Sequence, residues 1–135
     1  MIKLFVSLAL MLVLTTPVQA GQDDVFDAVA AAPQSHQVLL ENEKVRVLRV
    51  AIDAGATEPI HNHAWPSVMY FEQAQPITYI TYEMRDGTPV ETARMDAPVE
   101  ALIGAASSPP EGLHAVHNRG AEKFLAVRVE FKPQP

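Results

Sequence analysis

A hydrophobic period of two runs through this chain from residue 38 to residue 131, and it constrains the fold more than any other feature. Segments 44–53, 67–72 and 77–84 are rich in β-branched and aromatic residues, which predicts three strands. No amphipathic segment longer than about ten residues follows Pro33, so no sustained helix is expected there. Short strands with turn signals every 8 to 12 residues or so predict an all-β single domain, a sandwich or a barrel.

A hairpin is predicted at the Asp86-Gly87 dipeptide, which lies between segments 77–84 and 89–96. Aspartate followed by glycine is typical of a two-residue turn in which both residues take positive φ.

The last predicted strand, 123–131, separates two kinds of side chain. Apolar residues occupy one face (Leu125, Val127, Val129 and Phe131), and Arg128 and Glu130 lie on the other. This pattern is typical of a half-exposed antiparallel strand.

The first 20 residues are typical of a secretory signal peptide. Lys3 precedes an eleven-residue run, 4–14, that is apolar except for one serine, and the segment ends in Val18-Gln19-Ala20. The run is shorter than the ~20 residues that cross a membrane. We therefore expect a periplasmic or secreted protein without stable membrane association after cleavage. A short uncleaved interfacial anchor is the alternative.

Cleavage after Ala20 leaves 115 residues with 9 Lys+Arg and 16 Asp+Glu, a net charge of −7. This charge argues against nucleic-acid binding, which needs clustered basic residues. The chain has no cysteine, which excludes disulfides, thiolate metal sites and a catalytic thiol. We expect residues 21–37 to form a leader, either a short helix capped by Asp23 or Asp24 or a disordered segment. Residues 38–132 should form the β-domain.

Four of the five histidines occur in two pairs, His61 with His63 and His114 with His117. On a strand, residues two apart share a face, so His61 and His63 present two imidazoles together. His114 and His117 are three apart and cannot share a face of one straight strand, so only one of them is expected to join the first pair. Neutral imidazoles bind zinc, copper, iron and nickel.

The sequence resembles the cupin family in two places. Gly55 followed after five residues by His61-Asn62-His63 is similar to the start of the first cupin motif. The segment 110–114, which ends in His114, with Asn118 and Gly120 resembles the second motif. The resemblance covers residues 39–131 and implies an antiparallel jelly-roll β-barrel. It also implies a divalent metal bound by His61, His63 and His114, and it favours His114 over His117.

The sequence departs from the cupin pattern where the family carries a glutamate ligand, because Ser67 and Val68 stand there. A site of three histidines with open positions is therefore expected, as in catalytic zinc sites. Zinc, copper, iron, manganese and nickel all remain candidates for the metal. The glycine that closes the first motif and one residue of the second motif are also missing.

Four further residues are expected to line the pocket: Ser67, Met69, Phe71 and, at its rim, His117. Met69 and Phe71 share a face with Ser67, which by alternation is the barrel interior. His36 is expected at the surface. Val68 and Tyr70 make the outer face of the same strand apolar, which predicts a homodimer.

Three functions are compatible with these observations. The first is a metal-dependent enzyme acting on a small molecule, of the oxygenase or isomerase type. The second is a non-catalytic extracytoplasmic module that binds a small molecule or a metal. The third is a degenerate, metal-free cupin that serves as an interaction domain. Catalytic residues other than the metal ligands are not identified by the sequence.

Overall fold

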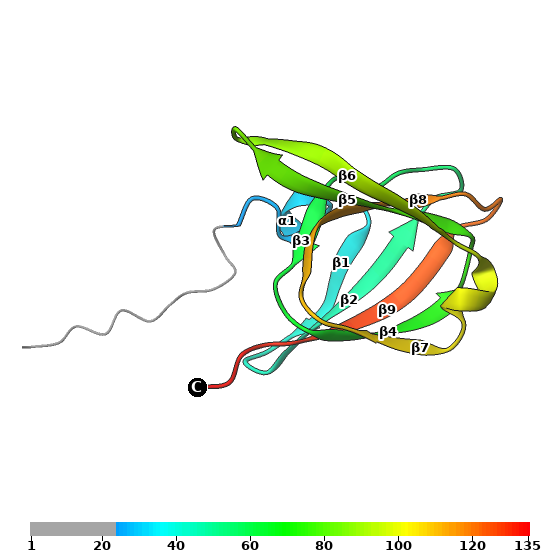
Figure 1. The fold of residues 1–135 in the computed structure, drawn as a ribbon. Coiled ribbons are helices and arrows are strands. Elements are labelled where there is room, and N and C mark those ends of the chain that lie inside the picture. Colours follow the sequence, from blue (N-terminus) through cyan, green and yellow to red (C-terminus); the bar gives the residue numbers. More distant parts are fainter. Residues whose placement is uncertain (1–23) are drawn as a thin grey trace, which may run out of the picture.

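The structure, a computed structural model, describes residues 24–135. These residues form two antiparallel sheets of five and four strands that face each other as the two halves of one barrel (Figure 1). The larger sheet has the order β1-β2-β9-β4-β7, with β1 (His36–Glu41), β2 (Val45–Ile52), β9 (Phe124–Phe131), β4 (Ser67–Gln73) and β7 (Ala105–Ser108). The smaller has the order β3-β8-β5-β6, with β3 (His61–His63), β8 (Glu111–Asn118), β5 (Ile77–Arg85) and β6 (Thr88–Ala97). Two short helices, α1 (Ala28–Ala31) and η1 (Val99–Leu102), complete it. The expectation of an all-β jelly-roll barrel is confirmed.

The hydrophobic core lies between the two sheets, towards one end of the barrel. It is built from buried side chains of β2, β5 and β9, namely Val50, Ile52, Ile77, Phe124 and Ala126. Strand β2 shows how the sequence produces this arrangement, because its exposure alternates along its length and Leu48, Val50 and Ile52 point inward.

The predicted hairpin between β5 and β6 is confirmed. Asp86 and Gly87 have φ values of 51° and 77°. Positive φ at both central residues gives the turn a twist that matches the flanking strands.

Strand β9 has the predicted extent, but its charged face is the buried one. Arg128 is 2% exposed and Glu130 is 0% exposed. The apolar residues on the other face, such as Val127 and Val129, lie on the outside of the barrel and are half-buried. The usual rule that apolar side chains face inward therefore gives the wrong orientation for β9, because the barrel interior is itself polar at this end.

The N-terminal segment packs against the barrel through helix α1. The helix cap is Asp27, whose carboxylate accepts a hydrogen bond from the Val29 amide, so the expected cap at Asp23 or Asp24 is wrong. Ala28 and Ala32 are fully buried.

The predicted signal peptide and cleavage site lie outside the described residues. Within residues 24–135, no helix has both the length and the apolar character needed to span a bilayer.

Candidate metal centre

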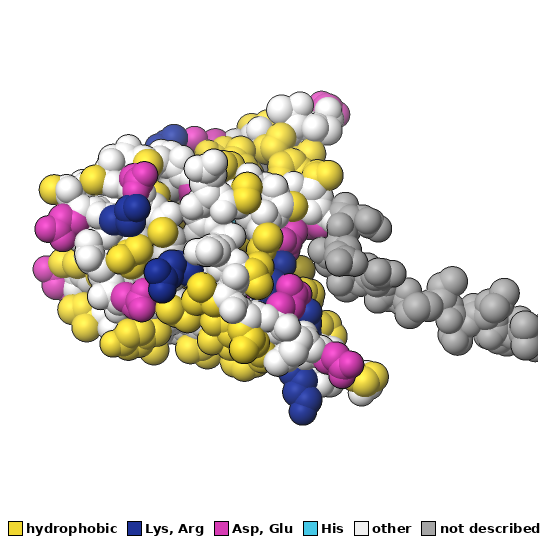
Figure 2. Space-filling view, turned by 180° about the vertical axis from the view of Figure 1, so that it is seen from behind, with side chains coloured by type: hydrophobic (Ala, Val, Ile, Leu, Met, Phe, Trp, Pro, Cys, Tyr) yellow, Lys and Arg dark blue, Asp and Glu magenta, His cyan; other side chains and the backbone are white. Residues whose placement is uncertain are grey.

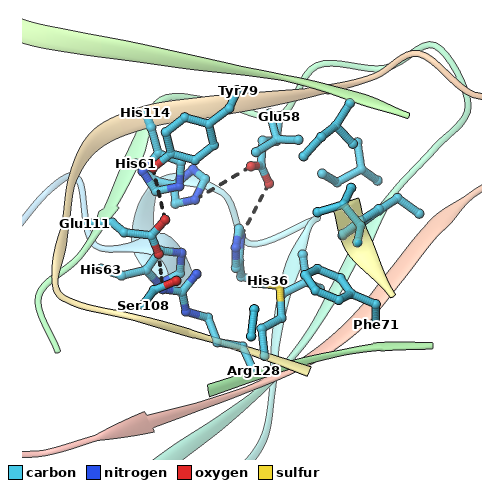
Figure 3. A pocket seen from close by; sticks show the side chains of 18 residues that line it. His36, Glu58, His61, His63, Phe71, Tyr79, Ser108, Glu111, His114 and Arg128 are labelled. Carbon is cyan, nitrogen blue, oxygen red and sulfur yellow. Dashed lines mark hydrogen bonds and ion pairs between the residues drawn. The ribbon is translucent and has the colours of Figure 1, made fainter. Parts of the chain in front are cut away.

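Four histidines converge between the sheets at the polar end of the barrel (Figure 3). His36 comes from β1, His61 and His63 from β3, and His114 from β8, and none is more than 3% exposed. The register of β3 and β8 places His61 directly opposite His114. The centroids of these two rings lie 4.4 Å apart, and those of His36 and His61 lie 4.5 Å apart.

Two of these rings have a defined tautomer. Nδ1 of His61 lies 2.8 Å from the carbonyl oxygen of Pro59, and Nδ1 of His114 lies 2.8 Å from that of Gly112. A carbonyl oxygen only accepts, so each Nδ1 carries the proton and donates it. Nε2 of both neutral rings therefore keeps a lone pair.

His63 is oriented by a carboxylate. Its Nδ1 donates to Oε1 of Glu130 over 2.6 Å, and Oε2 of Glu130 accepts from Nε of Arg46 over 2.6 Å. Arg46 also donates to both carboxylate oxygens of Asp27, at 3.0 and 2.8 Å. All four side chains are buried. This chain of charges leaves Nε2 of His63 as the free nitrogen, as in histidines whose metal-binding nitrogen is fixed by a carboxylate partner.

Burial keeps all four imidazoles neutral. It lowers the pKa of His36 and of His61 to about 3. It also lowers the pKa of His63 and of His114 below the usual range of histidine. Neutral imidazole is the form that binds a metal.

Glu58 is a fifth buried polar residue of this cluster, and it lies in the segment between β2 and β3. Its Oε1 lies 3.8 Å from Nε2 of His61, and its Oε2 lies 3.9 Å from Nδ1 of His36. Burial raises the pKa of Glu58 to about 8.

Two groups of three residues have potential ligand atoms within 4.8 Å of one another: His36, His61 and His63, and Glu58, His61 and His114. His61 belongs to both. The predicted triad is divided between them, because His63 falls in the first group and His114 in the second. The His63 and His114 rings have a centroid distance of 5.5 Å.

The histidines lie at one side of a cavity of about 230 Å³. The rest of its wall is largely apolar and includes both Met69 and Phe71. Ser67 does not line the cavity, although it is buried beside Glu130 in the register of β4 and β9. His117 does not line it either. Its Nδ1 lies 2.9 Å from the hydroxyl of Thr57, on a face of β8 that His114 does not share.

The expectation that His36 lies at the surface is wrong, because it is 3% exposed and lines the cavity. His36 begins β1 and pairs with Val50 of β2, whose side chain faces the core. Cross-strand partners share a face of the sheet. The strand therefore starts before residue 38, and its first side chain enters the barrel.

Four further polar side chains of the cavity wall were not predicted: Tyr79, Ser108, Glu111 and Arg128. The Tyr79 hydroxyl donates to Oε1 of Glu111 over 3.0 Å, and its ring stacks on His114 with a centroid distance of 4.8 Å. Arg128 donates to the other oxygen of Glu111. A usable signal for Arg128 was its alternation with Phe124 and Ala126 on one face of β9.

No protein-family model matches the sequence, and no curated protein is similar enough to count as a relative. Solved structures do match. A cupin domain from Bordetella pertussis is 21% identical, with a TM-score of 0.55 over 73% of this chain and 92% of that chain. A Bacillus halodurans protein is 14% identical, with a TM-score of 0.50 over 75% and 72%. These similarities show the fold.

Proposed function

We propose that this protein, which has the cupin fold, binds a divalent metal ion through Nε2 of His61, His63 and His114. One observation carries this proposal. Each of the three rings donates its Nδ1 proton to a fixed oxygen, so each keeps a lone pair on Nε2. Nε2 of His61 is also buried, and no hydrogen-bond partner for it exists within the described part of the chain. Buried polar atoms without a partner are costly, and a bound cation would satisfy this one.

We further propose that the bound ion makes the protein an enzyme for a small molecule, of the oxygenase or isomerase type. An ion held here would supply a Lewis acid or a site for dioxygen. The apolar wall, which includes Met69, Phe71 and Val116, would hold the apolar part of the substrate and exclude water. Tyr79 and Arg128 lie in the same wall and would contact its polar part.

Metal analysis tests the proposed site. The purified wild-type chain should bind one zinc or cobalt(II) ion, and the double variant His61→Ala/His63→Ala should lose it. His117→Ala is the matched control, because His117 lies outside the cavity wall. Full metal content in the double variant would contradict the ligand assignment. A wild-type protein that binds no metal would favour the degenerate, metal-free cupin.

Oxygen consumption and NMR of product formation on a panel of small molecules together separate an oxygenase or an isomerase from a binding module. Turnover that disappears in the double variant supports catalysis. Ligand-dependent melting with metal bound but without turnover would support the non-catalytic module instead.

We also propose that the mature protein works in the periplasm or outside the cell and takes up its metal there. The charge and apolar pattern of residues 1–20, which predicts a signal peptide, supports this proposal. Outside the cytoplasm, the general order of affinity favours copper and zinc over ferrous iron. Elemental analysis of protein isolated from its native compartment tests this preference, and stoichiometric iron would contradict it.

The homodimer is proposed to form through the outer face of the larger sheet. Apolar residues exposed there include Leu40, Val68, Tyr70 and Phe131. Figure 2 shows hydrophobic side chains gathered along the lower side of the molecule, where β4, β7 and β9 lie in Figure 1. A two-fold axis would place this apolar face against its own copy.

A charge placed in this face tests the dimer. Val127 lies on β9 between the outward side chains of Arg49 and Tyr70 in the strand register. Val127→Glu should give a monomer in analytical ultracentrifugation, whereas Thr92→Glu on the exposed strand β6 should leave a dimer. A wild-type monomer at high concentration would contradict this proposal.

A further inference from the structure

We propose that Glu58 and His36 are ligands of the same metal ion, as a carboxylate and a fourth imidazole from outside both histidine motifs. This inference rests on the proposed function, in which His61, His63 and His114 hold the ion. It changes the coordination sphere from three nitrogens to four nitrogens and an oxygen.

The first support is a set of buried atoms without partners. Nδ1 of His36, Oε2 of Glu58 and Nε2 of His61 each lack a hydrogen-bond partner among residues 24–135. All three side chains are 2% exposed or less. Three such atoms gathered in one place point to a missing common partner, since native proteins pair nearly all buried polar groups.

The distances fit a shared cation better than direct hydrogen bonds. The separations from Glu58 to His36 and to His61 are 3.9 and 3.8 Å, which exceed hydrogen-bond length. Two ligand atoms that each lie about 2.1 Å from one five-coordinate ion are about 3.0 to 3.6 Å apart, for ligand angles of about 90° to 120°. A contraction of about half an ångström would bring the carboxylate and both rings onto one ion.

The backbone holds Glu58 in place. Its amide donates to the carbonyl oxygen of Val116 over 3.1 Å, and the neighbouring Thr57 forms an antiparallel β-bridge with His117. The loop segment is therefore attached to β8, the strand that also carries His114. His36 is fixed in the same way, because its amide donates to Ala32 at the end of α1 and its strand pairs with β2.

The chemistry of the site gives this carboxylate a role. The sequence has Ser67 and Val68 where a glutamate ligand would follow the histidine pair. Glu58 precedes His61 by three residues, and its carboxylate lies within 4.8 Å of potential ligand atoms of His61 and His114. An ionised carboxylate would offset part of the charge of a divalent ion, and it can bind through one oxygen or two.

Cobalt(II) titration of the whole protein is the test. Glu58→Gln and His36→Gln keep most of the side-chain volume but replace the carboxylate or the imidazole with a neutral amide, which is a much weaker ligand for cobalt(II). Each should weaken cobalt binding beyond the roughly 10- to 100-fold that loss of an outer partner causes. Each should also change the visible cobalt spectrum. Glu72→Gln and His117→Gln are the matched controls, and both should keep the wild-type affinity and spectrum.

Wild-type affinity and spectrum in either cavity variant would overturn the proposal. If a variant does not fold, X-ray absorption of the zinc-loaded wild-type protein replaces it. Four imidazoles and an oxygen from the protein are expected, and three imidazoles alone would overturn the proposal. Failure of the proposed function is distinct, because the wild-type protein would then bind no metal or the His61→Ala/His63→Ala variant would keep it.

Discussion

Nδ1 of His63 lies 2.6 Å from Oε1 of Glu130, and both side chains are buried. The carboxylate is itself held by Arg46, which Asp27 anchors from the start of helix α1. A candidate metal ligand is thus connected through two charged residues to the N-terminal segment. This connection explains how Glu130 can lie on the inner face of β9.

Glu130→Gln should weaken zinc binding by roughly 10- to 100-fold, because the neutral amide is a poorer partner for the His63 ring. Titration of the metal-free protein with zinc measures this loss. The exposed variant Glu72→Gln should bind like the wild type. Unchanged affinity in Glu130→Gln would contradict a role for the carboxylate in orienting His63.

Asp27→Ala should lower the free energy of unfolding by about 3 to 5 kcal/mol. The change removes the helix cap and leaves Arg46 buried with one of its two carboxylate partners missing. Urea denaturation measures the loss. Asp53→Ala is the control, because its ion pair with Lys123 is exposed and should contribute less than about 1 kcal/mol. Equal losses would show that the Asp27 pair adds nothing beyond a surface contact.

Gly87→Ala should destabilise the protein by about 1 kcal/mol, since its φ of 77° is unfavourable for a residue with a Cβ. Gly112→Ala is the matched control for thermal unfolding. Neither glycine has an atom within 4 Å of an added Cβ, but Gly112 has no positive φ. A larger loss in Gly112→Ala would contradict this reason.

The sequence predicted the strands and the hairpin because these depend on local alternation and turn chemistry. The face of β9 was not predictable in this way. Arg128 and Glu130 face inward since partners from distant segments, Glu111 and Arg46, satisfy their charges there. Local polarity carries no information about such partners.

The candidate site was predictable only where a motif marked it. His61, His63 and His114 stand out by spacing, and all three line the cavity, although their potential ligand atoms fall into two groups. Glu58 and His36 belong to no motif. His36 reaches the cavity because β1 pairs with β2, and Glu58 reaches it because its neighbour Thr57 forms a β-bridge with β8. A ligand set assembled by tertiary contacts cannot be inferred from spacing along the chain.

The stability of the metal-free protein should pass through a maximum near pH 6.5. The folded-state pKa of His36 and of His61 is lowered to about 3. The unfolded chain therefore binds more protons than the folded protein once the pH falls below about 6.5. The free energy of unfolding then falls by up to about 1.4 kcal/mol per pH unit for each histidine. The folded-state pKa of Glu58 is raised to about 8. Between about pH 4.5 and pH 8, Glu58 is therefore protonated in the folded protein but ionised in the unfolded chain. The contribution of this proton to the free energy of unfolding is lost as the pH rises through that range.

Urea denaturation between pH 4 and pH 9, with a chelator present, measures this profile. Glu58→Gln cannot ionise at this position, so it should lose the decline above pH 6.5 and keep the one on the acid side. His36→Gln should make the acid decline shallower without changing the alkaline side. A Glu58→Gln profile identical to that of the wild type would mean that Glu58 does not hold its proton in the folded protein, and that the alkaline decline has another origin.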